Sequence, residues 1–273
     1  MNQQQRAFFG FSRRPFTAHS DDQPWFDDER TAHFKRLGQL VERGGFALVH
    51  GAPGCGKTRI IKHLIGTLNT NHHQPIYIPH ATLNESGLLQ TLAWQLSLEP
   101  SNSRPRNIQR ITTHITNSKQ IPVIILDELQ HASHQTLEAL RLLCEAQLTP
   151  STLIPVILIG TDEFVGLLTM KVCQSLRQRI TLCVNLKPLT KDQVPQYINH
   201  HLKLAQAHHD IITAPALNLI AETTGAIPRL IEHLTRTALE IAADDNSQTV
   251  ELRHVDQATK LTLIIPSSPE ARI

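Results

Sequence analysis

The chain has 273 residues, of which 40% are hydrophobic and 18% are charged, and its formal net charge is +2. This composition is typical of a folded globular protein with one large domain or two modest ones. No apolar run approaches the length of a membrane-spanning helix, and glutamines occupy the start of the chain where a signal peptide would be apolar. We therefore expect a cytoplasmic protein with no membrane contact. The net charge is too small to indicate nucleic-acid binding by itself.

The cysteines and histidines do not indicate a metal site. Cys55, Cys144, Cys173 and Cys183 form no C-x-x-C pair and lack metal-ligand spacing, so we expect reduced thiols. Adjacent histidines lie in polar stretches without carboxylate or cysteine partners at ligand spacing, so we expect them to be solvated.

Residues 1–35 are irregular and aromatic, with breaks at Pro15 and Pro24. So many aromatic side chains must pack on something, and we expect a strap that lies across the domain that follows. Arg6, Arg13 and Arg14 are expected to face water or a partner. A helix around Asp28–Arg43 then leads into the first strand. The aromatic residues of this stretch are Phe8, Phe9, Phe11, Phe16, Trp25, Phe26 and Phe34.

Residues 46–67 combine a short apolar strand, a glycine-rich turn and a helical pattern. The turn, residues 51–58, matches Gly-x-x-x-x-Gly-Lys-Thr, the P-loop, in which backbone N–H groups and a helix N-terminus hold phosphate. Lys57 would neutralise charge on the β- and γ-phosphates, and the Thr58 hydroxyl would bind Mg²⁺. A chance resemblance is the alternative, and the strand–loop–helix order argues against it. We predict binding of ATP and Mg²⁺, with contacts from Gly51, Ala52, Pro53, Gly54, Cys55, Gly56, Lys57, Thr58 and Arg59.

The next segment predicts a strand at 76–78 and a helix at about 85–98. The helix is expected to carry Leu88, Leu89, Leu92, Trp94 and Leu96 on and around its buried side. A loop at 99–107 follows.

Basic residues without acidic ones mark residues 100–126, which contain Arg104, Arg106, Arg110 and Lys119. Such a run is either a solvated helix face or a loop and helix that contact nucleic-acid phosphates. The residues alone leave both interpretations open.

An apolar strand at 121–126 ends in Asp127 and Glu128, the pattern of a Walker B motif. Asp127 would hold the Mg²⁺ shell, and Glu128 would orient the attacking water and accept its proton. Two acids in an ordinary strand-to-helix turn are the alternative, which the P-loop upstream disfavours.

Two further buried strands are predicted at 154–159 and 181–186. Thr161 follows the first and would sit between the two motifs, where it would help to hold the water. Arg177 and Arg179 precede the second. They are either solvated or, in an oligomer, positioned to reach a neighbour's γ-phosphate, for which we favour Arg179.

From residue 187 the pattern changes from strands to helices, at 198–207, 214–224, 228–243 and in a last segment within 249–263. Gly225 ends one helix and Pro228 begins the next. Arg229 at that helix start would sense the γ-phosphate from its own subunit, or is an exposed arginine at a helix-entry turn.

Together these motifs resemble the ExeA-like AAA+ proteins. The resemblance includes the N-terminal Phe8-Phe9-Gly10-Phe11, residues 123–130 with Asp-Glu-x-Gln, residues 176–180 and residues 226–231. It implies an α/β P-loop NTPase fold in which a parallel five-stranded sheet lies between helices and is followed by a small all-helical lid. The implied divisions are a strap at 1–35, an ATPase core at 36–186, a lid at 187–262 and a tail at 263–273. Part of the strap would line the adenine site.

Members of this family occur as secretion-assembly ATPases and as ATP-dependent partners of DDE transposases akin to TnsC, IstB and MuB. The secretion form continues into a transmembrane helix and a peptidoglycan-binding domain, so we favour the transposition regulator, and Thr161 agrees with that choice. The resemblance then implies a homo-oligomer, a ring or helical filament with a hexamer per turn, on double-stranded DNA. It would recruit a DDE-type transposase and a target-selection protein, and hydrolysis would release it. The implied DNA contacts are Thr82, Asn84, Ser103, Arg104 and Arg106.

Three other functions stay open. The first is an ATPase for secretion-system assembly, which would be indifferent to DNA. The second is a scaffold that binds ATP and rarely hydrolyses it, and the third is a helicase loader.

Overall fold

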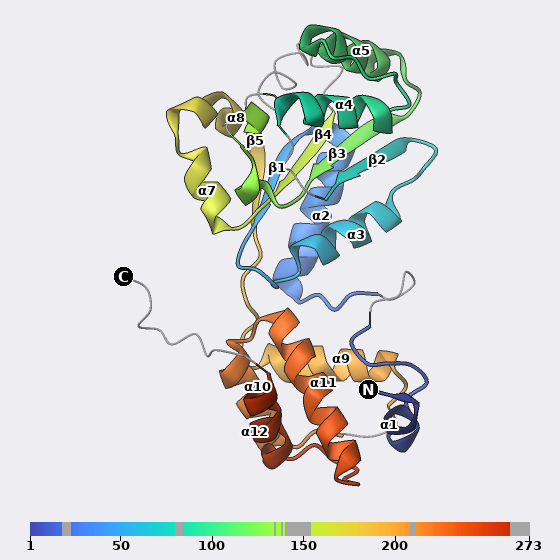
Figure 1. Cartoon of the computed structure of the whole chain (residues 1–273), viewed down its shortest axis with the longest axis vertical. Helices are drawn as coiled ribbons and strands as arrows, with labels where there is room; N and C mark the ends of the chain where they lie inside the picture. Colours follow the sequence, from blue (N-terminus) through green and yellow to red (C-terminus); the bar gives the residue numbers. More distant parts are fainter. Residues whose placement is uncertain are drawn as a thin grey trace. The chain divides into compact units, whose positions relative to one another are not determined.

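The computed structural model describes residues 1–17, 23–79, 84–133, 135–137, 139, 154–207 and 211–262. The chain divides into two compact units (Figure 1). The sheet unit comprises Asp28–Pro53 and Lys57–Leu186. The helical unit comprises Met1–Asp27, Gly54–Gly56 and Lys187–Ile273. In the described part of the chain, no helix has both the length and the apolar character needed to cross a bilayer.

A five-stranded sheet with the order β2-β3-β4-β1-β5 forms the centre of the sheet unit. All of its strand pairs are parallel, which confirms the fold class predicted from the sequence. In the described part of the chain, the connections from β1 to β2, from β2 to β3 and from β4 to β5 contain helices, as is usual between parallel strands. The strands are β1 (Gly45–His50), β2 (His73–Ile78), β3 (Ile121–Leu126), β4 (Pro155–Ile159) and β5 (Ile180–Asn185).

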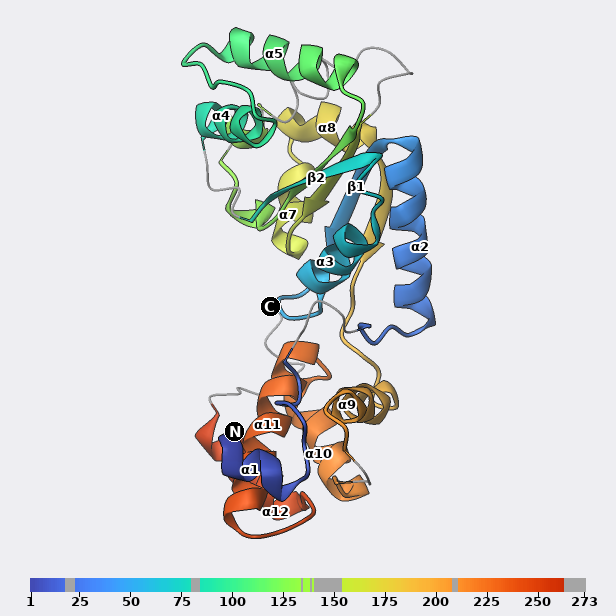
Figure 2. The ribbon, with the colours of Figure 1, turned by 90° about the vertical axis from the view of Figure 1, so that its right-hand side faces the viewer.

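Helices cover both faces of this sheet, with α2 along one face and α4 and α7 on the other (Figure 2). Successive strand residues such as Ala47 and Leu48 point to opposite faces, and both are buried. This two-sided burial explains why the strands read as continuous apolar runs. The helical elements of the unit are α2 (Asp28–Arg43), α3 (Lys57–Thr67), α4 (Glu85–Gln95), α5 (Arg104–Asn117), η1 (Leu129–His131), α7 (Asp162–Leu168), η3 (Lys171–Cys173) and α8 (Gln174–Arg179).

Two predictions on α4 and α5 are wrong. Trp94 is 70% exposed, because the buried stripe of α4 runs through Leu88, Leu92 and Leu96, and Trp94 lies about 200° around the helix from Leu92. The predicted loop at 99–107 ends early, since α5 begins at Arg104. The buried amide of Asn107 fixes this helix start by accepting from the Ser101 N–H (2.8 Å) and donating to the Ser101 carbonyl (2.7 Å).

The helical unit is built from α9 (Gln193–Leu204), α10 (Ala214–Thr224), α11 (Pro228–Asp244) and α12 (Leu252–Leu261). The predicted boundaries at Gly225 and Pro228 are confirmed: Gly225 ends α10 in a left-handed conformation, and Pro228 begins α11. The apolar faces of these helices share one core that includes Leu202, Ile220 and Leu239.

Aromatic residues near the N-terminus pack into the helical unit. The prediction that they lie across the sheet unit is therefore wrong. Phe9, Phe11 and Phe16 are at most 6% exposed and belong to the same cluster as α9 to α11. Arg13 donates through Nε to the Leu204 carbonyl (2.8 Å), so it does not simply face water. The carbonyl groups at the end of a helix lack partners within the helix, and the strap supplies donors for them. Phe34 lies apart from the strap, on α2.

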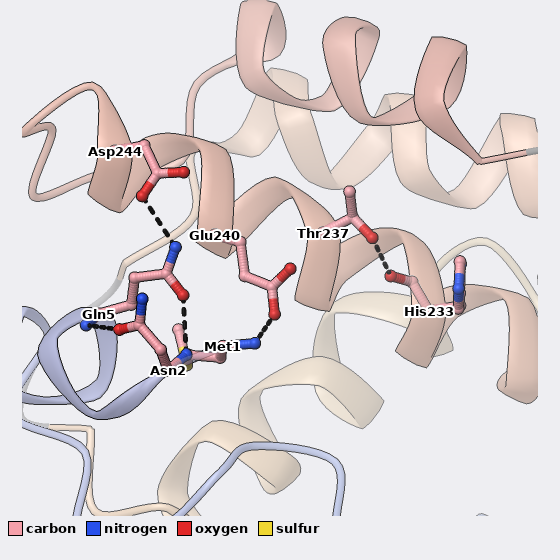
Figure 3. Close-up of polar contacts among 7 residues, drawn as sticks. All are labelled: Met1, Asn2, Gln5, His233, Thr237, Glu240 and Asp244. Atoms are coloured by element: carbon pink, nitrogen blue, oxygen red, sulfur yellow. Dashed lines mark hydrogen bonds and ion pairs between the residues drawn. The ribbon is translucent and has the colours of Figure 1, made fainter.

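A short helix, α1 (Gln3–Phe8), joins the strap to α11 (Figure 3). The amino group of Met1 forms an ion pair with Glu240, and Gln5 Nε2 donates to Asp244 Oδ1 over 2.8 Å. Asn2 and Gln5 also cap the start of α1, because Gln5 N donates to Asn2 Oδ1 (2.9 Å) and Asn2 N donates to Gln5 Oε1 (2.8 Å). The strap is therefore held to the helical unit by polar contacts as well as by apolar burial.

Candidate active site

The candidate site lies at the carboxyl ends of three adjacent strands. β3, β4 and β1 are neighbours in the sheet. Each of them is followed by polar residues that were predicted to be functional. β1 leads into the P-loop, β3 into Asp127 and Glu128, and β4 into Gly160 and Thr161. The carboxyl ends of parallel strands share one edge of the sheet, which is where open α/β sheets bind their ligands.

The entry to the P-loop depends on Gly51. Its φ is +140°, and a Cβ there would lie 2.2 Å from the Leu186 carbonyl oxygen, so only glycine fits. Lys57 begins α3, and its Nζ donates to the carbonyls of Gly51 (2.8 Å) and Ala52 (3.1 Å). The predicted phosphate-binding lysine thus lies beside the loop at a helix N-terminus, where an anion is stabilised. Arg59 is in the first turn of α3.

Asp127 is 3% exposed and receives several hydrogen bonds. Its Oδ2 accepts from the Thr58 hydroxyl (2.9 Å) and from the Tyr77 hydroxyl (2.7 Å), and its Oδ1 accepts from the Glu128 N–H (2.8 Å). Burial raises the pKa of Tyr77 well above its ordinary value, and the hydrogen bond to Asp127 adds to this rise. The hydroxyl of Tyr77 therefore stays protonated well above neutral pH and can keep donating to Asp127.

The Thr58 and Asp127 pair fits a magnesium ion. Both supply hard oxygen ligands from facing elements, and Mg²⁺ is usually bound by one or two carboxylates together with phosphate and water oxygens. Among the residues that the structure describes, no group of three or more histidine, cysteine or acidic side chains could hold a metal by itself. A nucleotide-dependent ion suits this donor set better than a resident one.

Glu128 has a left-handed backbone conformation, with φ 58° and ψ 38°. A non-glycine residue there is strained and persists only where its surroundings hold it. Its carboxylate accepts a hydrogen bond from Gln130 Nε2, and Gln130 Oε1 accepts from the Thr161 N–H over 3.2 Å. The Gln130 amide therefore joins the ends of β3 and β4.

Thr161 occupies the N-cap position of α7 but makes no capping hydrogen bond, and its Oγ1 is buried with no partner in the described part of the chain. A buried hydroxyl is costly to leave unpaired, so this atom suits a water or ligand that the protein holds during turnover. The next residue, Asp162, interacts through Oδ1 with His50 Nδ1 at 2.7 Å. This contact ties the end of β1 to the start of α7.

The three arginines singled out in the sequence lie on different elements. Arg177 donates through one guanidinium nitrogen to the carbonyls of Leu168 (3.2 Å) and Thr169 (3.3 Å), which occupies it at the end of α7. Arg179 ends α8, and its guanidinium makes no hydrogen bond or ion pair to another described residue. Arg229 is the second residue of α11, in the helical unit, and is exposed.

The described residues predicted to contact DNA lie at the starts of α4 and α5. Thr82 is outside the described residues. Asn84 caps α4 by accepting from the Gly87 N–H over 2.9 Å. Ser103 precedes α5, and Arg104 and Arg106 lie in its first turn, so these arginines are helical and not in a loop.

Sequence reasoning missed Tyr77, Gln130 and the contact between His50 and Asp162. The position of Tyr77 could have been noticed in the sequence. It places a polar hydroxyl between two isoleucines near the end of β2. Gln130 was noticed only as part of a resemblance. Its contact with Thr161 spans 31 residues and carries no signal in local spacing.

Comparison with known proteins agrees with this geometry. Residues 41–168 match the family model described as an AAA domain. The chain is 31% identical over 241 residues to general secretion pathway protein A of Aeromonas hydrophila. The alignment covers 85% of this chain and 44% of that protein, so the chain spans less than half the length of its curated relative.

Several solved structures share the fold. Cdc6p of Pyrobaculum aerophilum matches with a TM-score of 0.69 and 17% identity, over 93% of this chain and 70% of its own. Aeropyrum pernix ORC1, solved in complex with DNA, matches with a TM-score of 0.64 and 20% identity. The match covers 88% of this chain and 66% of ORC1. The Thermotoga maritima RuvB branch migration motor matches with a TM-score of 0.59 and 20% identity. The match covers 85% of this chain and 66% of RuvB. At these identities the likeness shows the fold alone: the chain has the AAA+ fold.

Proposed function

We propose that this AAA+ chain hydrolyses ATP to ADP and phosphate and serves as the ATPase of a secretion-pathway assembly. The observation that supports the secretion role is the 31% identity to general secretion pathway protein A over most of this chain. This identity favours the secretion-assembly ATPase, which the sequence had left open as an alternative to the transposition regulator.

The chemistry is assigned to five side chains of the sheet unit. Lys57 would neutralise the β- and γ-phosphates, and Thr58 and Asp127 would hold Mg²⁺. Magnesium bound with the nucleotide supplies positive charge next to the transferred phosphoryl group. Glu128 would orient a water and accept its proton, and Thr161, with its unpartnered hydroxyl, would position the same water.

Two arginines would complete the site in an assembled homo-oligomer. Arg179 is our choice for the residue that reaches a neighbour's γ-phosphate, because Arg177 is already engaged by the carbonyls at the end of α7. Arg229 would report on the nucleotide of its own subunit. Stabilisation of the phosphoryl charge by such an arginine raises turnover by about 10³–10⁵-fold in enzymes that use one.

A second candidate is the DNA-bound transposition regulator, and one surface favours it. No acidic residue occurs from 100 to 126, while Arg106 and Lys119 are exposed on and after α5. Trp94, 70% exposed, lies on the neighbouring α4. A cluster of cationic side chains on one element, without acidic neighbours in sequence, is typical of surfaces that contact nucleic-acid phosphates, and Trp94 supplies a nearby fluorescent probe on the packed helix α4.

One experiment separates the two candidates. ATP turnover is measured with and without duplex DNA at low and moderate salt, while the fluorescence of Trp94 is followed in a Trp25→Phe background. The secretion role predicts turnover and fluorescence that ignore DNA. Quenching by DNA that weakens as salt rises and disappears in Arg104→Ala/Arg106→Ala, together with faster turnover, would establish the second candidate instead.

A further inference from the structure

We propose that Gln130 is a positioning residue that holds the carboxylate of Glu128 and couples it to Thr161. This inference rests on the proposed ATPase function. Its basis is the pair of hydrogen bonds made by one side-chain amide, from Nε2 to Glu128 Oε2 and to Oε1 from the Thr161 N–H (3.2 Å).

The chemistry of the partners fixes the orientation of this amide. The backbone N–H of Thr161 can only donate, so it must face Oε1. The NH₂ end of Gln130 then faces Glu128, whose ionised carboxylate can only accept. Rotating the amide by 180° would place two donors together and two acceptors together, and therefore the observed arrangement is the one that satisfies both neighbours.

Local backbone geometry explains why Glu128 needs such a partner. The residue is left-handed, and the strain at this position is tolerated only when the surroundings over-determine the conformation. Leu129, which is fully buried, anchors the 3₁₀ turn between the two polar residues. With the turn anchored at its centre, Gln130 can reach back to Glu128, and it can also reach across to the end of the neighbouring strand.

The two contacts can be separated by substitution. Gln130→Glu keeps the length of the side chain and an acceptor for the Thr161 N–H, but it loses the donor and places a second negative charge beside Glu128. Gln130→Ala removes both contacts. If the amide matters because it positions Glu128, both variants should lose turnover while still binding ATP.

The experiment measures kcat and KM for ATP, and the Kd of a fluorescent ATP analogue, for the wild type, Gln130→Glu, Gln130→Ala, Glu128→Gln and Glu128→Gln/Gln130→Ala. Gln196→Ala, an exposed glutamine on α9, is the matched control. We expect kcat to fall about tenfold to a hundredfold in both Gln130 variants, less than the ~10²–10⁴-fold that a general base contributes. KM and Kd should stay within about twofold. In the Glu128→Gln background, removing Gln130 should change kcat by less than about twofold, because residues that act as a unit are not additive.

The outcomes distinguish this inference from the proposed function. A wild type without turnover, or a Glu128→Gln variant as active as the wild type, would overturn the ATPase assignment. Full turnover in Gln130→Glu would overturn only the role of Gln130. An equal loss in both backgrounds, or loss of analogue binding in the Gln130 variants, would show that Gln130 supports the fold and does not act through Glu128.

Discussion

The hydroxyl of Tyr77 donates to Oδ2 of Asp127 over 2.7 Å, and the same oxygen accepts from Thr58. Tyr77 comes from β2, the strand beside β3, so a third strand end supports the candidate magnesium site. Two donors on one oxygen fix the rotation of the carboxylate before any ion binds, and pre-organised ligands bind ions with less loss of freedom.

We therefore predict that Tyr77→Phe weakens magnesium binding. The loss of one hydrogen bond, about 1 kcal/mol, should raise the Mg²⁺ concentration for half-maximal turnover by roughly threefold to tenfold. A magnesium titration of ATPase activity measures this. The control is Tyr197→Phe, which removes the other tyrosine hydroxyl, bonded to Glu232 in the helical unit. Equal magnesium dependence in the two variants would contradict the assignment.

Substitutions at Lys57 and Glu128 should separate binding from chemistry. Lys57→Ala removes the charge beside the loop and should abolish binding of a fluorescent ATP analogue. Glu128→Gln keeps the side-chain volume and should bind the analogue normally, while turnover falls by about 10²–10⁴-fold. If Glu128→Gln hydrolysed ATP at the wild-type rate, another group would have to be the base.

Gly51 and Gly66 should respond to alanine in opposite ways. In Gly51→Ala the new Cβ meets the Leu186 carbonyl at 2.2 Å in a backbone conformation that alanine disfavours, so we expect destabilisation of about 3 kcal/mol and loss of ATP binding. Gly66 is the next-to-last residue of α3 and has open space around it, so Gly66→Ala should stabilise the fold by about 0.5 kcal/mol. Urea unfolding compares both with the wild type.

The position of the aromatic strap predicts which unit it stabilises. Phe9→Ala should cost about 3–5 kcal/mol in the helical unit, because a nearly fully buried ring is lost. Amide hydrogen exchange should then speed up in α10 to α12 and stay unchanged in the strands. Phe164→Ala, a comparable loss in the core of the sheet unit, should produce the reverse pattern. Faster exchange in the strands of Phe9→Ala would mean that the strap packs elsewhere.

Mixing inactive subunits tests the role of Arg179. Arg179→Ala should bind ATP and lose turnover, and Arg177→Ala should mainly lose stability, because its carbonyl contacts at α7 disappear. If sites are shared between subunits, a mixture of Lys57→Ala and Arg179→Ala recovers part of the activity, since some interfaces then combine an intact loop with an intact arginine. A mixture as inactive as its components would rule out action of Arg179 on a neighbouring subunit.

The sequence by itself determined the features that depend on local spacing. The P-loop, the acidic end of β3, the apolar strands and the boundaries at Gly225 and Pro228 follow from turn chemistry and from burial on both faces of a parallel sheet. The order of these motifs also supported the resemblance to the ExeA-like AAA+ proteins, and that resemblance implied the fold class.

Only the tertiary structure decided the features that depend on contacts between distant residues. The sequence indicated that Phe9 and Phe11 are buried, but it did not indicate in which unit. In the structure they pack in the core of the helical unit. Trp94 was predicted to lie on the buried side of α4, but the packing of α4 turns the opposite side, with Trp94, toward water. Tyr77 and Gln130 became part of the candidate site because neighbouring strands end side by side, 50 and 31 residues apart in sequence from their partners Asp127 and Thr161. Hydrogen bonds between residues so far apart leave no periodic pattern in the sequence, so they can be identified only in the folded structure.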